Sequence, residues 1–514
     1  MPEQRLDRQP HIPLPPSLLS TGDYFEAKAR PGFRYRFPSA VEALANDIKR
    51  KMSEGLLAEH PQFFHLGPNR EDVRWSGILE YLRARNAIHS ISLDPPFTDE
   101  MKLYFFDILS PFDPALTDGH APQYFGYSRG VSEDYEEGIS KVIGEFLERY
   151  PLLLYRRKDL TRASIRDLER ARTKFLDPRL LAGFSEEQKK RLPDLVYDDR
   201  SVFYWVSGRS LADGNNALIP AQLVYWTYCR HHPGGLEPRL REANTNGAGG
   251  YFTREGALLS GLYECIQRDA FLSYWLNSQA PPLIDNATVE SPVVLDLLEQ
   301  ARRLEFDVRF LDVTSDVGVP AVFCALVNKS SYGPRVAFGG GCGLEPAEVL
   351  RRALTEAVGL YHWLRKKNIS MYLPEPYTPF SDHRIGQLER LLLWSDPAMF
   401  ERLQFFFKGR RETFKEFSSR APKAALPSET DELAWLVGRV ARLGAGYEPF
   451  AYEAKHPLLD ELGYASAKVV VPKLLPLYLN EHLATAGAPR LREAMDNLGL
   501  PPAVQLNPWP HPFP

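Results

Sequence analysis

The spacing of apolar residues predicts three helices, each of which follows a turn that contains glycine. Between residues 132 and 157, apolar side chains recur every three or four positions, and Ser132 is the expected N-cap. A second helix is expected from Thr253 to about Asn277, after the glycine-rich stretch 244–250. A third begins at Pro346, after the glycines at 339–343. Turn followed by helix is therefore predicted three times.

Apolar runs between these helices predict strands. Residues 306–313 and 321–327 are expected to form neighbouring strands, and shorter runs at 201–206 and 217–220 indicate further strands. Helical spacing is also expected within 40–86, after an extended proline-rich arm that ends near residue 30. From about Gly386 the chain is predicted mostly helical, with one strand-like run at 469–472. The pattern favours a mixed α/β fold.

Composition narrows the class of protein. A chain of 514 residues exceeds what one compact core usually supports, so at least two packed units are expected. The 62 basic and 66 acidic residues nearly balance, and the absence of a basic block argues against nucleic acid as a partner. The four cysteines are widely spaced, which predicts neither a zinc site nor disulfides. Without a signal-like or membrane-spanning run, we expect a soluble, cytoplasmic protein that does not enter a membrane.

Carboxylates occur at one spacing on the first two predicted helices. On each helix, a glutamate and the oxygen-bearing side chain three residues later share the face opposite the apolar stripe, and an arginine follows. One such face is usually only solvated. Two of them across a cleft would suit Mg²⁺, which binds carboxylates together with nucleotide phosphates. The expected metal ligands are Glu145, Glu148, Glu264 and Gln267, and the arginines expected to meet phosphate oxygens are Arg149 and Arg268.

The third helix and the preceding turns add candidate nucleotide contacts. Arg352 is a candidate phosphate clamp with Glu356 one turn later, although this pair is also typical of a surface ion pair. The turns at Ser128-Arg129-Gly130 and Asn246-Gly247 can aim N–H groups at an anion, or can serve only as helix entries. No P-loop, kinase catalytic loop or dinucleotide fingerprint occurs. An ATP site would therefore be of another kind.

In this order, the motifs resemble the YcaO family. The resemblance rests on G-E-x-x-E-R-Y at 144–150 after the 128–130 turn, on G-L-x-E through R-D at 261–269 after the N-G turn, and on R-A-L-T-E-A at 352–357. It extends from about Tyr124 to the C-terminus. The runs 469–477 and 507–514 are similar to those of the azoline-forming, streptolysin S-type cyclodehydratases.

The resemblance implies a YcaO-type fold with ATP and Mg²⁺ between carboxylate-bearing helices. It implies ATP-dependent cyclodehydration of Cys, Ser or Thr in a ribosomally made precursor peptide, with Arg352 and the Pro514 carboxylate as catalytic groups. Ser128, Arg129, Asn246 and Glu356 would join the arginines in cofactor binding. Alternatives are backbone thioamidation or amidine formation by the same amide activation, and a non-catalytic scaffold that supports a partner enzyme.

The resemblance also implies partners and a division of the chain. Expected partners are the precursor peptide, an E1-like leader-binding protein, a flavin-dependent azoline dehydrogenase and a second copy of the chain. The expected division is an N-terminal docking extension at 1–122, a nucleotide-binding core at 123–385 and a C-terminal region at 386–514 with the proline tail. Three positions depart from the family pattern: Gln267 replaces a carboxylate, Gly256 an acidic residue and Arg129 a lysine.

Overall fold

The computed structural model describes residues 35–36, 73–110 and 126–513, apart from residues 86, 89, 227, 233–234, 331, 368–369 and 423–425. The predicted proline-rich arm, most of the predicted 40–86 helix and Pro514 lie outside the described residues. Helix α4 (Val73–Ala84) lies within the predicted helical region.

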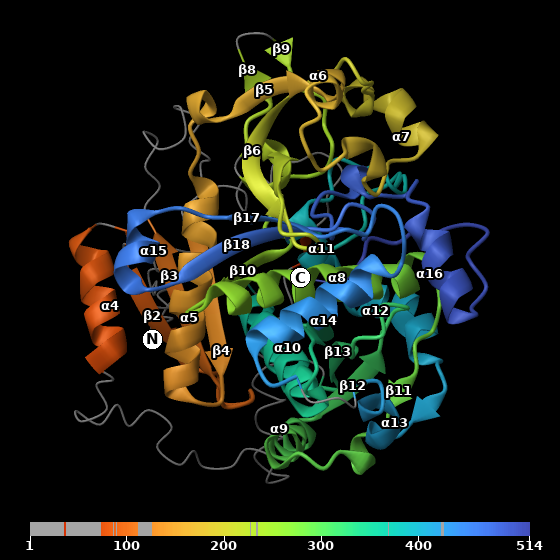
Figure 1. The fold of residues 1–514 in the computed structure, drawn as a ribbon. Coiled ribbons are helices and arrows are strands. Elements are labelled where there is room, and N and C mark those ends of the chain that lie inside the picture. The colour runs from red at the N-terminus through yellow and green to blue at the C-terminus, as the bar shows by residue number, and fades with distance from the viewer. Residues whose placement is uncertain are drawn as a thin grey trace, which may run out of the picture.

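Three larger sheets form the framework (Figure 1). The first has the order β2 (Ser90–Asp94), β3 (Tyr104–Ser110), β4 (Gly126–Ser132). The second runs β10 (Ala248–Tyr251), β18 (Ala465–Val470), β17 (Phe450–Glu453), β6 (Val202–Ser210), β5 (Thr161–Ser164), with β7 (Asn216–Pro220) also on β6. The third runs β14 (Val336–Cys342), β13 (Ala321–Asn328), β12 (Phe306–Asp312), β11 (Leu283–Ile284), β16 (Arg411–Glu412). Two small pairs complete the described strands: β1 (Tyr35–Arg36) with β15 (Ser370–Met371), and β8 (His231–His232) with β9 (Gly235–Leu236).

An edge strand of each larger sheet leads into one long helix. These helices are α5 (Tyr135–Arg149) after β4, α8 (Arg254–Leu276) after β10 and α10 (Pro346–Lys367) after β14. The shorter helices are α6 (Ile165–Arg170), α7 (Glu186–Arg191), α9 (Pro292–Arg303), α11 (Gln387–Trp394), α12 (Pro397–Leu403), α13 (Phe414–Ser418), α14 (Glu429–Ala441), α15 (Pro457–Leu462) and α16 (Arg490–Leu498). No helix of the described residues is long and apolar enough to cross a membrane.

Glycine lets each long helix lie directly on its own strand. A Cβ added to Gly130 would lie 2.1 Å from the carbonyl oxygen of Gly138, eight residues later. The same contact recurs between Gly249 and Ala257 at 2.1 Å, and between Gly341 and Val349 at 2.2 Å. Each helix also packs against the strand of another unit: α5 on β10, α8 on β14 and α10 on β4. The three strand–helix units therefore form a ring in which each one contacts the next.

The predicted helices and strands are largely confirmed. Thr253 caps α8, α10 begins at Pro346, and β12 and β13 pair antiparallel over the predicted residues. The predicted N-cap of the first helix is wrong. Ser132 pairs with Tyr104 as the end of β4, and the side chain of Asp134 caps α5 instead.

The C-terminal region contributes strands as well as helices. The predicted run at 469–472 lies in β18 only for its first two residues, because the strand spans Ala465–Val470, and the sequence analysis does not predict β17. Both strands lie between β10 and β6, far from them in sequence, as the blue arrows in Figure 1 show. The region after residue 386 therefore completes the sheet that begins with β10.

Candidate active site

Three glutamates are held in the same way by the three strand–helix units. The backbone N–H of Arg129 donates to Glu145, 16 residues later. The N–H of Gly247 donates to Glu264 at 2.8 Å across 17 residues, and that of Gly340 donates to Glu356 across 16 residues. The donors lie within β4, just before β10 and within β14, so the repeated bond fixes one carboxylate of each helix beside the strand of its own unit.

These glutamates and Glu148 form a carboxylate cluster. Glu148 interacts electrostatically with Glu145 and Glu264, and Glu356 interacts with the same two. Desolvation by the surrounding protein raises the pKa of Glu148 to about 8, with Arg149 opposing the rise and the neighbouring glutamates adding to it. Desolvation likewise raises the pKa of Glu356, against the nearby charge of Arg268. Such mutual repulsion is relieved when a cation binds.

Two arginines accompany the cluster at the predicted positions. Arg149 pairs with Glu145 at 2.6 Å, and Arg268 pairs with Glu264 at 3.2 Å. The Arg268 side chain is only 13% exposed, and its Nε and Nη1 atoms have no hydrogen-bond partner among the described residues. Buried donors normally have an acceptor. Phosphate oxygens would supply one.

The residues therefore fit ATP with Mg²⁺. The donor set is hard carboxylate oxygen beside unfilled guanidinium donors. Within the described ranges, no three His, Cys, Asp or Glu side chains are close enough to hold a metal ion by themselves. Mg²⁺ is usually bound by one or two carboxylates together with phosphate oxygens and water. Glu145, Glu148, Glu264 and Glu356 are the carboxylates that could hold it.

The other predicted nucleotide contacts differ in placement. Asn246 lies at the turn before β10, and its Oδ1 is buried without a partner in the described part of the chain. Ser128 is buried in β4. The Arg129 side chain is bound to Asp107, with 2.8 Å between Nε and Oδ1, so its backbone N–H is the part held at the cluster. Arg352 is 58% exposed and pairs with Glu348 rather than with Glu356.

Gln267 and the C-terminal tail meet beside the cluster. A Cβ at Gly340 would lie 2.4 Å from Gln267 Nε2 and 2.5 Å from the ring of Phe513. Phe513 is 1% exposed, and the guanidinium of Arg268 lies 4.1 Å above its ring centroid. These contacts bring the end of the tail to α8, the helix that carries Glu264, and Figure 1 shows the C-terminal end beside this helix.

The tail is anchored along its length by hydrogen bonds to its carbonyls. Trp275 donates to Trp509 at 3.3 Å, Trp394 donates to Pro510 at 3.1 Å, and Tyr377 donates to Pro508 at 2.6 Å. His511 in turn bonds the carbonyl of Tyr478 at 2.7 Å, so its Nε2 carries the hydrogen. A proline-alternating segment cannot form a sheet ladder, and here core side chains bind its carbonyls instead.

Lys468 is the residue of the site that the sequence analysis missed. It lies in β18, is 2% exposed, and interacts electrostatically with Glu264 and Glu148. A lysine inside an otherwise apolar buried strand is the signal that could have found it.

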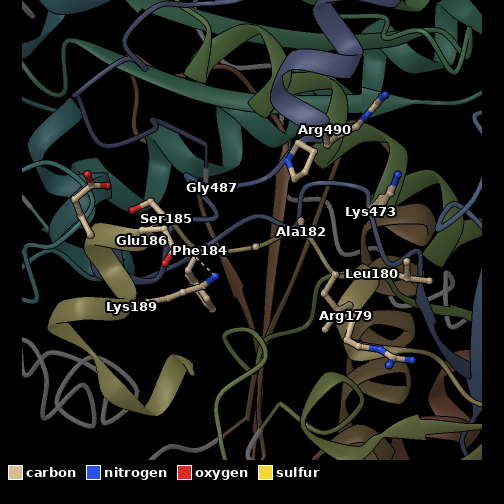
Figure 2. A pocket seen from close by; sticks show the side chains of 14 residues that line it. Arg179, Leu180, Ala182, Phe184, Ser185, Glu186, Lys189, Lys473, Gly487 and Arg490 are labelled. Atoms are coloured by element: carbon tan, nitrogen blue, oxygen red, sulfur yellow. Dashed lines mark hydrogen bonds and ion pairs between the residues drawn. The ribbon is translucent and has the colours of Figure 1, made fainter. Parts of the chain in front are cut away.

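A separate cavity of about 540 Å³ lies between the segment around Phe184 and that around Gly487 (Figure 2). None of the predicted site residues lines it. Its basic side chains are paired: Arg179 with Asp177, Lys189 with Glu186, Lys473 with Glu493, and Arg490 with Asp269. Among the described residues, it therefore offers an anionic ligand no basic side chain that lacks an acidic partner.

Comparison with known proteins agrees with this geometry. An uncharacterised protein of Methanothermobacter thermautotrophicus is 29% identical over 160 residues, which cover 31% of this chain and 41% of that relative. The alignment thus spans less than half of the relative's length. A heterocyclase solved with substrate and cofactor has a TM-score of 0.66 at 20% identity, covering 86% of this chain and 57% of that one.

A further solved structure supports the fold, and a family model decides the family. The YcaO protein of Methanopyrus kandleri, solved with AMPPCP and Mg²⁺, has a TM-score of 0.56 at 17% identity and covers 80% of this chain and 93% of that one. Residues 129–475 match the family model described as YcaO cyclodehydratase, ATP- and Mg²⁺-binding. The matched range begins within β4 and contains the rest of the three strand–helix units and the whole carboxylate cluster, so the chain belongs to the YcaO family and has its fold.

Proposed function

We propose that the chain catalyses ATP-dependent cyclodehydration of Cys, Ser or Thr in a ribosomally made precursor peptide, giving thiazoline or oxazoline rings. The observation that carries the proposal is the meeting of the carboxylate cluster, the unfilled donors of Arg268 and the buried tail at one place. The tail favours ring formation over the other reactions of an activated amide, because it resembles the azoline-forming branch.

In this reaction, the Cys, Ser or Thr side chain attacks the preceding backbone carbonyl. Bound ATP supplies the phosphoryl group that makes the former amide oxygen a leaving group, and phosphate departs as the C=N bond of the ring forms. The peptide loses one water per ring. Without phosphorylation, the former amide oxygen would have to leave as hydroxide, which is a poor leaving group.

The protein's part is to hold and neutralise charge. Glu145, Glu148 and Glu264 are the proposed metal ligands, with the neutral amide oxygen of Gln267 as a weaker one. The roles proposed for Arg149 and Arg268 are phosphate contacts, where planar donors suit phosphate oxygens. Five further residues are proposed as nucleotide contacts: Ser128, Arg129, Asn246, Arg352 and Glu356. The proposed catalytic groups are Pro514 and Arg352.

The proposal includes partners. The precursor peptide would be presented by a separate E1-like, leader-binding protein in the cytoplasm, and a flavin-dependent dehydrogenase would oxidise the rings. A homodimer is also proposed.

The test is ring formation on the cognate peptide with its partner protein, ATP and Mg²⁺, followed by mass spectrometry. Wild type should remove one water per ring and hydrolyse ATP in proportion. Glu145→Gln keeps the side-chain shape and removes one carboxylate, so it should lower the rate at least about 100-fold. The matched control is Glu136→Gln, on the exposed side of α5, which should act like wild type. Equal rates for Glu145→Gln and wild type would refute the assigned metal role.

One observation favours a second candidate, a non-catalytic scaffold. Gln267 stands at the position equivalent to Glu148 in the second unit, so the cluster has one carboxylate fewer than the repeated motif allows. A scaffold would keep the fold and its partner contacts without binding Mg²⁺–ATP. Calorimetric titration separates the two, since only the enzyme should give heat of nucleotide binding.

A further inference from the structure

Two buried cations lie beside the candidate site without a carboxylate partner. Lys468 and Arg241 are 2% and 9% exposed, and in the part of the chain that the structure describes neither forms an ion pair. Both line a small cavity together with Asn246 and Cys265. Burying a charge is costly unless it is bound by other groups, so these side chains require an explanation.

The hydrogen bonds of these cations connect two segments of the chain, and each segment supplies one of the two cations. From the first segment, 241–247, Arg241 donates to the carbonyls of Pro472 and Leu474. From the second, 468–480, Lys468 donates to the carbonyl of Asn244 at 2.6 Å. The Asn244 side chain also donates to Leu477 at 2.9 Å. The turn before β10 is therefore fixed from the C-terminal half of the chain.

The turn fixed in this way carries two groups of the candidate site. The Asn244 side chain accepts from the N–H of Asn246 at 3.0 Å, which closes the turn. Gly247 has φ +80°, a conformation that favours glycine, and its N–H binds Glu264. The carbonyl that Lys468 holds thus lies two residues before Asn246 and three before the donor to Glu264.

The charge of Lys468 also acts on the cluster. Glu264 and Glu148 are among the charges that favour its ammonium form, while burial lowers its pKa to about 8. An ammonium group has three donors, and among the described residues Lys468 forms one side-chain hydrogen bond, to Asn244.

We propose that Lys468 is a positioning residue of the nucleotide site: by holding the Asn244 carbonyl, it sets Asn246 for its contact with Mg²⁺–ATP. This inference rests on the proposed function, because it requires that the cluster binds the nucleotide. It adds a residue from outside the three strand–helix units to the machinery of the site.

The test is a double-mutant cycle on Mg²⁺–ATP affinity, measured by calorimetry on the full chain. Lys468→Met keeps the apolar stem and removes the donor and the charge, and should weaken binding at least about tenfold. Asn246→Ala should weaken it similarly. Because Lys468 acts through Asn246, the double variant should be no more than about twofold weaker than the weaker single variant.

Lys473→Met is the matched control. Lys473 is five residues further along the same segment, pairs with Glu493 at 3.5 Å and lies outside the candidate site, so the affinity should not change. If Lys468→Met does not give a cooperative melting transition, Lys468→Arg, which keeps the charge but moves the donors, takes its place in the same cycle.

The outcomes distinguish the two proposals. If wild type gives no binding heat, the proposed function fails, and this inference fails with it. If wild type binds and the Lys468 variant binds equally well, the inference alone is wrong. It is also wrong if the losses of the two single variants multiply in the double variant, because that result would show independent action.

Discussion

Glu481 is a buried carboxyl group in the segment that anchors the tail. Its side chain is inaccessible, Arg390 is 3.9 Å away, and the hydroxyl of Tyr377 is 3.4 Å away. Tyr377 already donates to the carbonyl of Pro508. The same hydroxyl also donates to Glu481, and this bond and the charge of Arg390 both favour the ionised carboxylate. Desolvation by burial outweighs them and raises the pKa of Glu481 from 4.5 to about 7.

This shift predicts how stability depends on pH. Between pH 4.5 and 7 the folded protein keeps a proton that the unfolded chain has lost, so this group makes stability fall as pH rises. Glu481→Gln removes that loss. The free energy of unfolding of the variant, relative to that of wild type, should increase by up to roughly 3 kcal/mol from pH 5 to pH 8. Urea unfolding at both values measures the gain, with Glu401→Gln, an exposed residue, as control. A constant difference at both pH values would contradict the assignment.

At the level of single residues, sequence spacing predicted the acidic members of the site but not what holds them. Glu145, Glu148 and Glu264 were identifiable because helical periodicity is a local property. The backbone donors to Glu145 and Glu264 lie 16 and 17 residues earlier in the chain, and Lys468 comes from a distant strand. The sequence offers Arg352 as a phosphate clamp or as a surface ion pair with Glu356, whereas the structure pairs it with Glu348 one turn earlier.

At the level of elements, the three strand–helix contacts are equivalent and demand glycine. The two nearest atoms that an added Cβ would meet at each of Gly130, Gly249 and Gly341 are backbone atoms, which cannot move without shifting the helix. Gly249→Ala should therefore cost at least about 2 kcal/mol of stability, and the other two alanine variants a similar amount.

Gly438→Ala is the control for that series. Gly438 lies inside α14 with nothing within 4 Å of the added Cβ, and alanine is the better helix former, so stability should rise by up to about 1 kcal/mol. Chemical denaturation measures all four variants. A neutral effect at Gly249 would show that the helix does not rest on the strand as closely as described.

The order of elements was predictable from the sequence, and their neighbours in the sheets were not. Glycine-rich turns and apolar periodicity gave α8, α10, β12 and β13, because these signals are local. Nothing local indicates that β18 separates β10 from β17. That arrangement depends on which faces are buried together, which is a property of the folded chain.

On the scale of the whole molecule, the tail joins the C-terminal end to the central core. The Phe513 ring packs against Phe271, 5.0 Å between centroids, and Phe323, 5.5 Å. Phe513→Ala should cost about 3–5 kcal/mol and leave Arg268 without its aromatic contact. Val504→Ala, at a fully exposed position of the same segment, should change little. Urea unfolding tests both variants, and equal midpoints would mean that the tail does not pack in solution.

Nucleotide binding should stabilise the molecule as a unit, because the cluster draws one helix from each of three sheets. A ligand that binds only the folded state adds about 2.7 kcal/mol when its concentration is 100 times the dissociation constant. Mg²⁺ with ATP should therefore raise the melting temperature by a few degrees, as measured by differential scanning fluorimetry.

The dependence on Mg²⁺ separates this effect from unspecific binding of an anion. Because the cluster is rich in carboxylates, ATP with EDTA should be repelled and give little or no shift, and Glu145→Gln should reduce the shift while Glu136→Gln keeps it. Gln267→Glu restores the carboxylate that the second unit lacks, so it should lower the Mg²⁺ concentration required for half of the shift. A shift that is equal with and without Mg²⁺ would place the nucleotide away from the cluster. No shift under any condition would favour the scaffold, which keeps the fold without binding Mg²⁺–ATP.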